Sequence, residues 1–272
     1  MTTVAHLAHL ARPPIDTDPA ATWAEYRHVI ENTIMNAPRS LQTRIGPSEL
    51  GASCDRCLVS KLAGIQEKRE AAWLPWVGSA VHEQLELAFA AANAGLSRTR
   101  WLVESEVTVG NVGGVDITGH ADLFDLELSE ITDWKIVGKT TLVKAKGHGP
   151  TAVYRKQIHL YGLGFVNRGL PVSRVRIAYL PRNEPTLANA FIWSEPYDES
   201  IALAALARAN QFATVINMFG AQHVLANTPP HTGQDFSCNR FPNPDGTYPT
   251  GRAFPDFTAL ATTNNNAPFG AI

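Results

Sequence analysis

Residues 115–137 read VDITGHADLFDLELSEITDWKIV, a stretch in which apolar residues largely alternate with polar ones. That period of two predicts strands at Val115–Leu128 and Glu130–Val137, joined by a tight turn. A Gly-Gly pair precedes the stretch and predicts a further turn, which connects it to an alternating strand at Trp101–Val109. We therefore expect three consecutive strands, a β-meander, in the middle of the chain.

Segments with the spacing of amphipathic helices lie on both sides of the meander. The expected helices cover residues 18–36, 47–64, 76–92, 150–167 and 197–220, and a short strand is expected at 173–180. This order predicts an α/β fold with a central mixed β-sheet flanked by α-helices. We expect a single domain over residues 1–225, with its core at about 45–182, and a C-terminal extension rich in Pro, Asn and Gly at 226–272.

The composition is that of an ordinary globular protein, because 44% of the 272 residues are hydrophobic and 18% are charged. It argues against disordered, collagen-like and coiled-coil chains. No apolar run is long enough to span a bilayer, and the N-terminus lacks a signal-peptide pattern. We therefore expect a protein with no membrane partner that is located in the cytoplasm, or in the host cell cytoplasm if a phage encodes it.

Basic residues are concentrated in one part of the chain, which we call the basic block. Residues 135–182 contain ten Lys and Arg and no Asp or Glu, although the whole chain has a formal net charge of −2. Clustered positive charge favours contact with phosphates, since it releases counterions from a nucleic acid. A solvated basic face without a ligand is the alternative, and charge alone does not choose between the two.

Two carboxylates and a lysine interrupt the apolar pattern of the two central strands. Asp133 and Lys135 project from one side of their strand, and Asp122 on the adjacent strand can lie beside them. Neighbouring buried carboxylates repel each other unless a cation lies between them or one binds a proton. Oxygen ligands of this kind suit Mg²⁺ or Mn²⁺. The alternative is a surface ion pair between Asp133 and Lys135, worth about 0–1 kcal/mol.

Polar residues on two of the expected helices could complete a site around this strand pair. His82 and Glu86 share a face of the helix before the meander, and Tyr154, Gln157 and Tyr161 share a face of the helix after it. Taken singly, a helical His is more often a surface or core residue than a ligand, and a Tyr stripe is more often packing. Together, these side chains could surround one strand pair.

Five short motifs, in this order, resemble a known family. They are Pro47-Ser48-x-Leu50-Gly51-x-x-Cys54-x-Arg56, Gly78-x-x-x-His82-x-x-x-Glu86, Gly119-x-x-Asp122, Asp133-Trp134-Lys135 and Gln157-x-x-x-Tyr161. The combination is similar to the RecB-type branch of the PD-(D/E)XK nuclease superfamily, which includes phage exonucleases and CRISPR-associated relatives. The resemblance covers about residues 45–182. It implies a restriction-endonuclease-like core, dependence on Mg²⁺ or Mn²⁺, and hydrolysis of DNA phosphodiester bonds.

The resemblance also implies roles for individual residues. The implied metal ligands are His82, Asp122, Asp133 and the backbone carbonyl of Trp134; the implied catalytic lysine is Lys135; and Gln157 and Tyr161 would close the site and contact DNA. The basic block would then form the wall along which the DNA backbone runs. DNA is the implied partner, a recombination or single-strand-annealing protein would fit as a second one, and the oligomeric state is left open.

A metal-dependent DNA exonuclease, acting in phage or mobile-element recombination or repair, is therefore the expected function. A nucleic-acid-binding module that lost catalysis is one alternative, although it would have little reason to retain Asp122, Asp133 and Lys135. An endonuclease on the same fold is another, but no segment resembles a base-reading insertion. Glycoside hydrolysis by the acid pair fits poorly, because it gives no role to Lys135 or to the basic block.

The cysteines Cys54, Cys57 and Cys238 raise the question of a further metal site, and their odd number argues against a secreted disulfide scaffold. Some members of the branch hold an iron–sulfur cluster with one cysteine near the first motif and three near the C-terminus. Here Cys54 has the matching place, but Cys57 stands where a basic residue is usual. With His231 the three thiolates could bind zinc or an incomplete cluster. We expect buried free thiols instead, the usual state of intracellular cysteines.

Overall fold

The computed structural model describes residues 18–37, 44–233 and 237–249. The chain divides into two compact units, of which one groups residues 1–42 with 69–77 and the other groups 43–68 with 78–272. In the first unit, helix α1 (Pro19–Asn36) begins as predicted, because the Asp18 carboxylate accepts a hydrogen bond from the backbone N–H of Ala20. The second unit contains the sheet and the candidate site.

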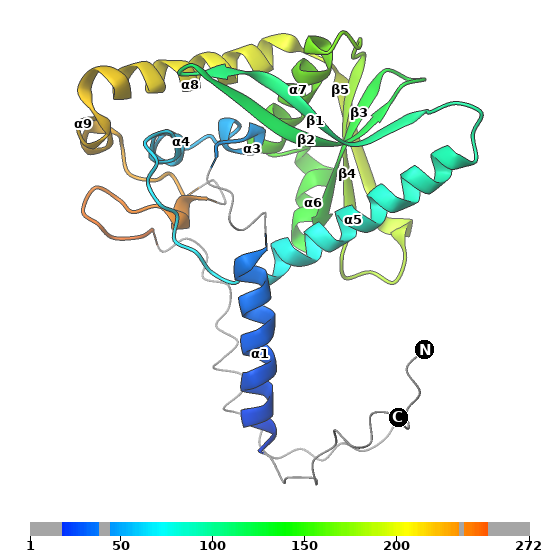
Figure 1. Ribbon diagram of the computed structural model, residues 1–272, viewed down its shortest axis with the longest axis horizontal. Coiled ribbons are helices and arrows are strands. Elements are labelled where there is room, and N and C mark those ends of the chain that lie inside the picture. Colours follow the sequence, from blue (N-terminus) through cyan, green and yellow to red (C-terminus); the bar gives the residue numbers. More distant parts are fainter. Residues whose placement is uncertain (1–17, 38–43, 234–236, 250–272) are drawn as a thin grey trace. The chain divides into compact units, whose positions relative to one another are not determined.

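A five-stranded mixed sheet forms the centre of the second unit (Figure 1), which confirms the predicted fold class. In spatial order, its strands are β1 Trp101–Val112, β2 Val115–Asp125, β3 Glu130–Val137, β4 Arg174–Pro181 and β5 Phe191–Pro196. The neighbouring pairs β1–β2 and β2–β3 are antiparallel, β4 is parallel to β3, and β5 is antiparallel to β4. The parallel pair needs a crossover, which helices α6 (Lys139–His148) and α7 (Ala152–Asn167) supply.

Helices pack against both faces of the sheet. On one face, Phe89 of α5 (Trp73–Ala94) stacks on Trp134 of β3 with 5.6 Å between ring centroids. On the other face, α7 contributes to the main core, where its Phe165 lies 4.4 Å from Phe124 of β2 between ring centroids. One face of the sheet is therefore covered by a helix that precedes it in the chain, and the other by a helix that lies between β3 and β4.

The first motif forms two helices rather than the single helix expected at 47–64. These are α3 (Pro47–Leu50) and α4 (Asp55–Leu62). Cys54 lies between them with extended backbone angles of φ −79° and ψ 114°, and it is the N-cap of α4. The helical spacing of the apolar residues thus indicates which side chains are buried, but it does not predict that the helix is interrupted between Leu50 and Asp55.

The sequence pattern does not predict α6, β5 or the short helix α9 (Ala221–Asn227). α6 buries only Leu142 and Ala145, so its apolar face is too narrow to give a helical signal. β5 is a six-residue strand at the edge of the sheet, and it ends at Pro196. The long helix α8 (Glu199–Phe219) follows the prediction and is succeeded by α9.

The predicted C-terminal extension lies partly outside the described residues, namely at 234–236 and 250–272. Its described part includes Cys238 and Phe241, which are buried together with Cys54 and Cys57 in a small cluster separate from the main core. The boundary at residue 225 stays a prediction. In the part of the chain that the structure describes, every helix is too short or too polar to cross a lipid bilayer.

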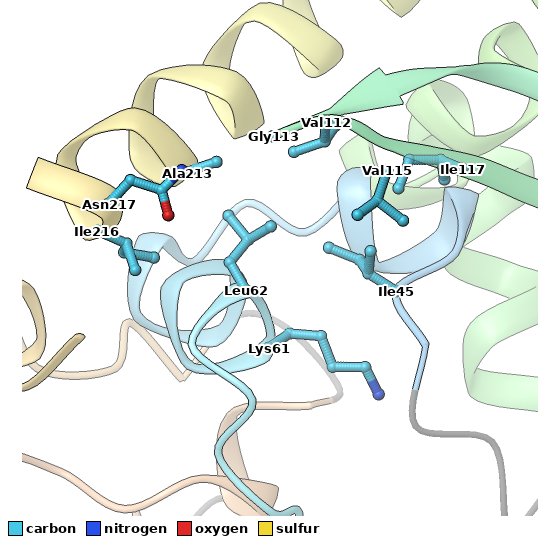
Figure 2. Close-up of a pocket in the computed structure, with 10 residues that line it drawn as sticks. All are labelled: Ile45, Lys61, Leu62, Val112, Gly113, Val115, Ile117, Ala213, Ile216 and Asn217. Atoms are coloured by element: carbon cyan, nitrogen blue, oxygen red, sulfur yellow. The ribbon is translucent and has the colours of Figure 1, made fainter. Parts of the chain in front are cut away.

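A small cavity of about 210 Å³ lies between α4, the β1–β2 hairpin and α8 (Figure 2). Its walls are mainly aliphatic and include Ile45, Leu62, Val115 and Ile216. The charged residue at its rim, Lys61, forms an ion pair with Glu67. None of the predicted site residues lines this cavity.

Candidate active site

The candidate site lies where β2 and β3 separate. The two strands pair from Asp125–Glu130 to Leu123–Thr132 and no further, whereas β3 stays paired with β4 along its whole length. Asp122 and Asp133 lie just beyond the last of these pairs, at the point where the two strands diverge. We call this point the fork. The backbone N–H of Trp134 bridges this fork with a 2.6 Å hydrogen bond to Asp122 Oδ2.

Three side chains capable of binding a metal converge at the fork, from three different elements. His82 Nδ1 of α5 lies 3.3 Å from Asp122 Oδ1 of β2 and 3.9 Å from Glu104 Oε1 of β1. One ligand atom from each residue lies within 4.8 Å of the others. The structure thus brings the predicted ligands His82 and Asp122 together and adds Glu104, whereas the carboxylate of Asp133, the other predicted side-chain ligand, pairs with Lys135.

Glu104 is the site residue that the sequence motifs do not identify. It lies between the register pairs Val103–Leu123 and Ser105–Ala121, so it faces Asp122 across the β1–β2 ladder. Its backbone has φ 41°, in the left-handed region that residues other than glycine seldom adopt. Such strained residues cluster at functional sites, where the surrounding structure holds them in place.

The Asp133 and Lys135 side chains form the second half of the site, next to α7. Lys135 Nζ lies 2.6 Å from Asp133 Oδ2 and donates a 3.1 Å hydrogen bond to Gln157 Oε1. Gln157 Nε2 in turn donates to the Tyr161 hydroxyl at 3.5 Å. Lys135 Nζ also lies 4.6 Å from the ring centroid of Tyr154. The predicted residues of β3 and α7 therefore form one connected chain.

The surroundings of this site change the pKa values of three groups. Burial lowers the pKa of His82, but Asp122 and Glu104 outweigh that effect and raise it to about 9. Burial raises the pKa of Asp133 to about 6, although Lys135 opposes the change. Burial also lowers the pKa of Lys135, but the charges of Asp133 and Asp122 raise it above its ordinary value. The surroundings therefore favour the protonated forms of His82 and Lys135, and a metal ion bound at His82 has to displace the imidazolium proton.

The donor set at the fork fits a hard divalent cation such as Mg²⁺ or Mn²⁺. Two carboxylates and one imidazole are within coordination reach of a common point, and carboxylate ligands suit these ions. The N–H and C=O of one residue in an extended strand point to the same edge. Since the Trp134 N–H faces Asp122, the Trp134 carbonyl faces the same edge and can act as a further ligand.

A glycine in the third motif allows the elements around the site to approach closely. A Cβ atom at Gly119 would lie 2.8 Å from Pro47 Cδ and 3.1 Å from Tyr161 Cε1, too close for ordinary packing. Pro47, Gly119 and Tyr161 each belong to a different motif. The absence of a side chain at Gly119 therefore lets three motifs that are far apart in the chain pack against one another.

The basic block does not form a continuous positive surface. Arg155 makes two hydrogen bonds, of 2.6 and 3.0 Å, with the Glu195 carboxylate, which also binds the buried His159. Arg174 and Arg176 form ion pairs with Glu130. The acids come from outside the block, on β3 and β5, so the charge count along the chain could not reveal them. Three exposed lysines remain together on α6: Lys139, Lys144 and Lys146.

Comparison with known proteins gives similar solved structures, but no protein-family model and no curated protein match the sequence. The protein SSO0001 is 16% identical, with a TM-score of 0.46, covering 75% of this chain and 96% of its own. The alkaline exonuclease from Laribacter hongkongensis is 11% identical, with a TM-score of 0.45, covering 67% and 91%. A phage-related exonuclease from Haemophilus somnus is 12% identical, with a TM-score of 0.37, covering 77% and 91%.

Two of these solved structures are exonucleases. At identities of 11–16% and TM-scores below 0.5, these likenesses do not extend to an activity of this chain.

Proposed function

We propose that this protein is a metal-dependent DNA exonuclease whose active site is the fork between β2 and β3. The observation that carries the proposal is the convergence of His82, Glu104 and Asp122 beside the Asp133–Lys135 pair. A purely structural cluster would gain little from three carboxylates and two cations, because removing each charge from water is costly. A site that binds a metal and a phosphate uses all five.

The residues divide the chemistry between them. His82, Glu104, Asp122 and the Trp134 carbonyl would hold Mg²⁺ or Mn²⁺, and the ion would polarise a phosphate and lower the pKa of a bound water. Asp133, which the resemblance implies as a further ligand, would instead hold Lys135. Lys135, which Asp133 keeps protonated, stabilises the charge that develops on the phosphate oxygens. Gln157 accepts a hydrogen bond from Lys135 and so fixes the direction of its ammonium group.

DNA is the proposed substrate because of the charge beside the site. α6 begins at Lys139, shortly after β3 ends, and it presents exposed lysines that can contact successive phosphates. A role in phage or mobile-element recombination or repair, with a recombination or single-strand-annealing protein as partner, belongs to this proposal as its biological setting.

Linear and circular DNA separate the proposed function from its alternatives. End-labelled linear duplex and single-stranded DNA, and a covalently closed circle, are incubated with Mg²⁺, with Mn²⁺ or with EDTA. We expect mononucleotides or short products from the linear DNA, an intact circle, and no cleavage in EDTA. Cleavage of the circle would instead support an endonuclease, and binding without cleavage in any metal would support a non-catalytic module.

Matched variants on one strand assign the activity to the fork. Asp122→Asn should reduce cleavage by about 10²-fold or more, since it removes a metal ligand. Asp116→Asn, an exposed aspartate on the same strand, should leave cleavage unchanged. Equal activity of the two variants would show that the nuclease activity arises elsewhere.

A further inference from the structure

A second cluster of metal-binding side chains lies outside the candidate active site. The three cysteines, Cys54, Cys57 and Cys238, are all buried, and one ligand atom of each lies within 4.8 Å of the others and of His231. The residues come from two segments about 180 positions apart in the chain. Folding has therefore assembled this group, and a single local motif does not account for it.

The distances within the cluster match a single tetrahedral metal ion. Cys57 Sγ lies 3.7 Å from Cys238 Sγ, and His231 Nδ1 lies 3.4 Å from Cys54 Sγ and 3.3 Å from Cys57 Sγ. Zinc binds thiolates at about 2.3 Å, so two sulfur ligands on one tetrahedral ion are roughly 3.8 Å apart. A Cys-x-x-Cys pair, here Cys54 and Cys57, together with a distant Cys and His is an ordinary ligand set for structural zinc.

The same distances argue against the other states of these cysteines. A disulfide needs sulfur atoms at about 2.05 Å, far closer than the 3.7 Å between Cys57 and Cys238. The iron–sulfur cluster implied by the resemblance uses four cysteines, and several iron atoms spread the ligands apart. Here the fourth ligand is the His231 imidazole and all four donors are within 4.8 Å, so that cluster does not fit.

A buried arginine beside the cluster supports an anionic centre. Arg56 is 4% exposed, and its guanidinium donates hydrogen bonds to the backbone carbonyls of Pro242, Leu225 and Thr228. Burial lowers the pKa of Arg56, and the charges of Cys54, Asp245 and Cys57 oppose that change. Three thiolates and one Zn²⁺ carry a net charge of −1, which this cation would balance.

We propose that Cys54, Cys57, Cys238 and neutral His231 bind one Zn²⁺ in a closed structural site. The three thiol protons leave to solvent on binding, and no redox change is involved. Four protein ligands leave no open position for a substrate, so the ion has a structural role. It joins the start of α4 to His231 and Cys238, and Arg56 of α4 binds the backbone before and after these two ligands, at Leu225, Thr228 and Pro242. This proposal replaces the expectation of free thiols and does not depend on the proposed nuclease function.

Metal analysis of the full chain tests the proposal. The protein is purified from zinc-supplemented medium without chelators, in an Asp122→Asn background, so that the active site contributes little metal. We expect about one zinc per chain and no acid-labile sulfide. Exchange for Co²⁺ should give the strong visible absorption of tetrahedral thiolate coordination. Iron with acid-labile sulfide, or less than about one tenth of a zinc per chain, would overturn the proposal.

A histidine pair provides the matched variants. His231→Ala should lose most of the zinc and lower the melting temperature, whereas His223→Ala, an exposed histidine on α9, should change neither. If His231→Ala does not fold, the unmodified chain is treated with a zinc chelator and subjected to limited proteolysis. Removal of zinc should then expose the segment at 231–249 to cleavage, and unchanged proteolysis after complete removal would contradict the structural role.

Discussion

Glu104 faces Asp122 across the first two strands of the sheet, and His82 lies within 4 Å of a carboxylate oxygen of each. Glu104 keeps this position with a left-handed backbone at φ 41°. Strain of this kind costs of order 1–3 kcal/mol and persists where surrounding contacts hold it. We infer that contacts around Glu104 hold its backbone in this strained conformation and so keep its carboxylate beside that of Asp122.

Glu104→Gln should therefore reduce DNA cleavage by about 10²-fold or more, because the amide is a poor ligand for Mg²⁺ or Mn²⁺. Glu106→Gln is the matched control, since Glu106 is exposed on the same strand two residues away. Initial cleavage rates at saturating DNA, across a series of metal concentrations, measure both. Equal rates for the two variants would exclude Glu104 from the site.

The sequence motifs predict most of this site but not Glu104, and a β-bulge explains the difference. From the pair Val112–Val115 at the hairpin turn, regular pairing would put Glu104 opposite Leu123. The register shifts between Thr108 and Gly110, and the shift moves Glu104 to face Asp122. One inserted residue is not visible in the alternation of apolar and polar residues.

Helices and strands that bury a wide apolar face could be predicted from the sequence, and those that bury a narrow one could not. The meander at 101–137 and helix α7 carry strong periodicity, because one side of each is buried in the main core. α6 and β5 bury few side chains, so their sequences contain little pattern. The pairing of Arg155 with Glu195 likewise depends on the position of β5, which could not be read from the charges near Arg155.

His82→Ala should weaken metal binding more than it affects the chemical step. The imidazole is one ligand among several, so its loss lowers affinity and higher metal concentration can compensate. We expect strongly reduced cleavage at low Mn²⁺, with substantial recovery at high Mn²⁺. His120→Ala, an exposed histidine of β2, should behave as the unmodified protein. A rate for His82→Ala that is unchanged at limiting Mn²⁺ would leave His82 as a packing residue.

Asp125 should link the stability of the sheet to acid pH. Its carboxylate accepts hydrogen bonds from Arg100 Nε, the Trp101 indole and the backbone N–H groups of Glu127 and Leu128. Burial raises the pKa of Asp125, but Arg100 and the two backbone donors outweigh burial and hold it below its ordinary value. Its stabilising effect is therefore complete above the unfolded pKa of about 3.9 and is lost as pH falls through the folded value.

Asp125→Asn should lower the free energy of unfolding at pH 7 by about 1–3 kcal/mol, because buried donors lose a charged acceptor. It should also flatten the fall in stability below about pH 4. Urea unfolding at pH 7 and at several values between pH 3 and 5 measures both effects. Asp116→Asn, exposed on the same strand, should keep the stability and acid dependence of the unmodified chain.

The lysines of α6 and the paired arginines of the basic block should affect DNA binding differently. Lys144 and Lys146 are exposed on α6, whereas the guanidinium of Arg155 is held by the Glu195 carboxylate. A cation that already has a carboxylate partner displaces few counterions from DNA. The α6 lysines should therefore contribute more to the salt dependence of binding than Arg155 does.

Lys144→Gln should weaken binding to every DNA sequence and reduce the slope of log affinity against log salt by about 0.7–0.9, the amount expected for one phosphate contact. Arg155→Gln changes the net charge by the same amount and should leave the slope unchanged. Titrations at four or more salt concentrations in Ca²⁺, which supports binding in place of the catalytic metal, give both slopes. If the slope changes with Arg155 and not with Lys144, the DNA runs along β5 rather than α6, because Glu195 would have to release its partner to a phosphate.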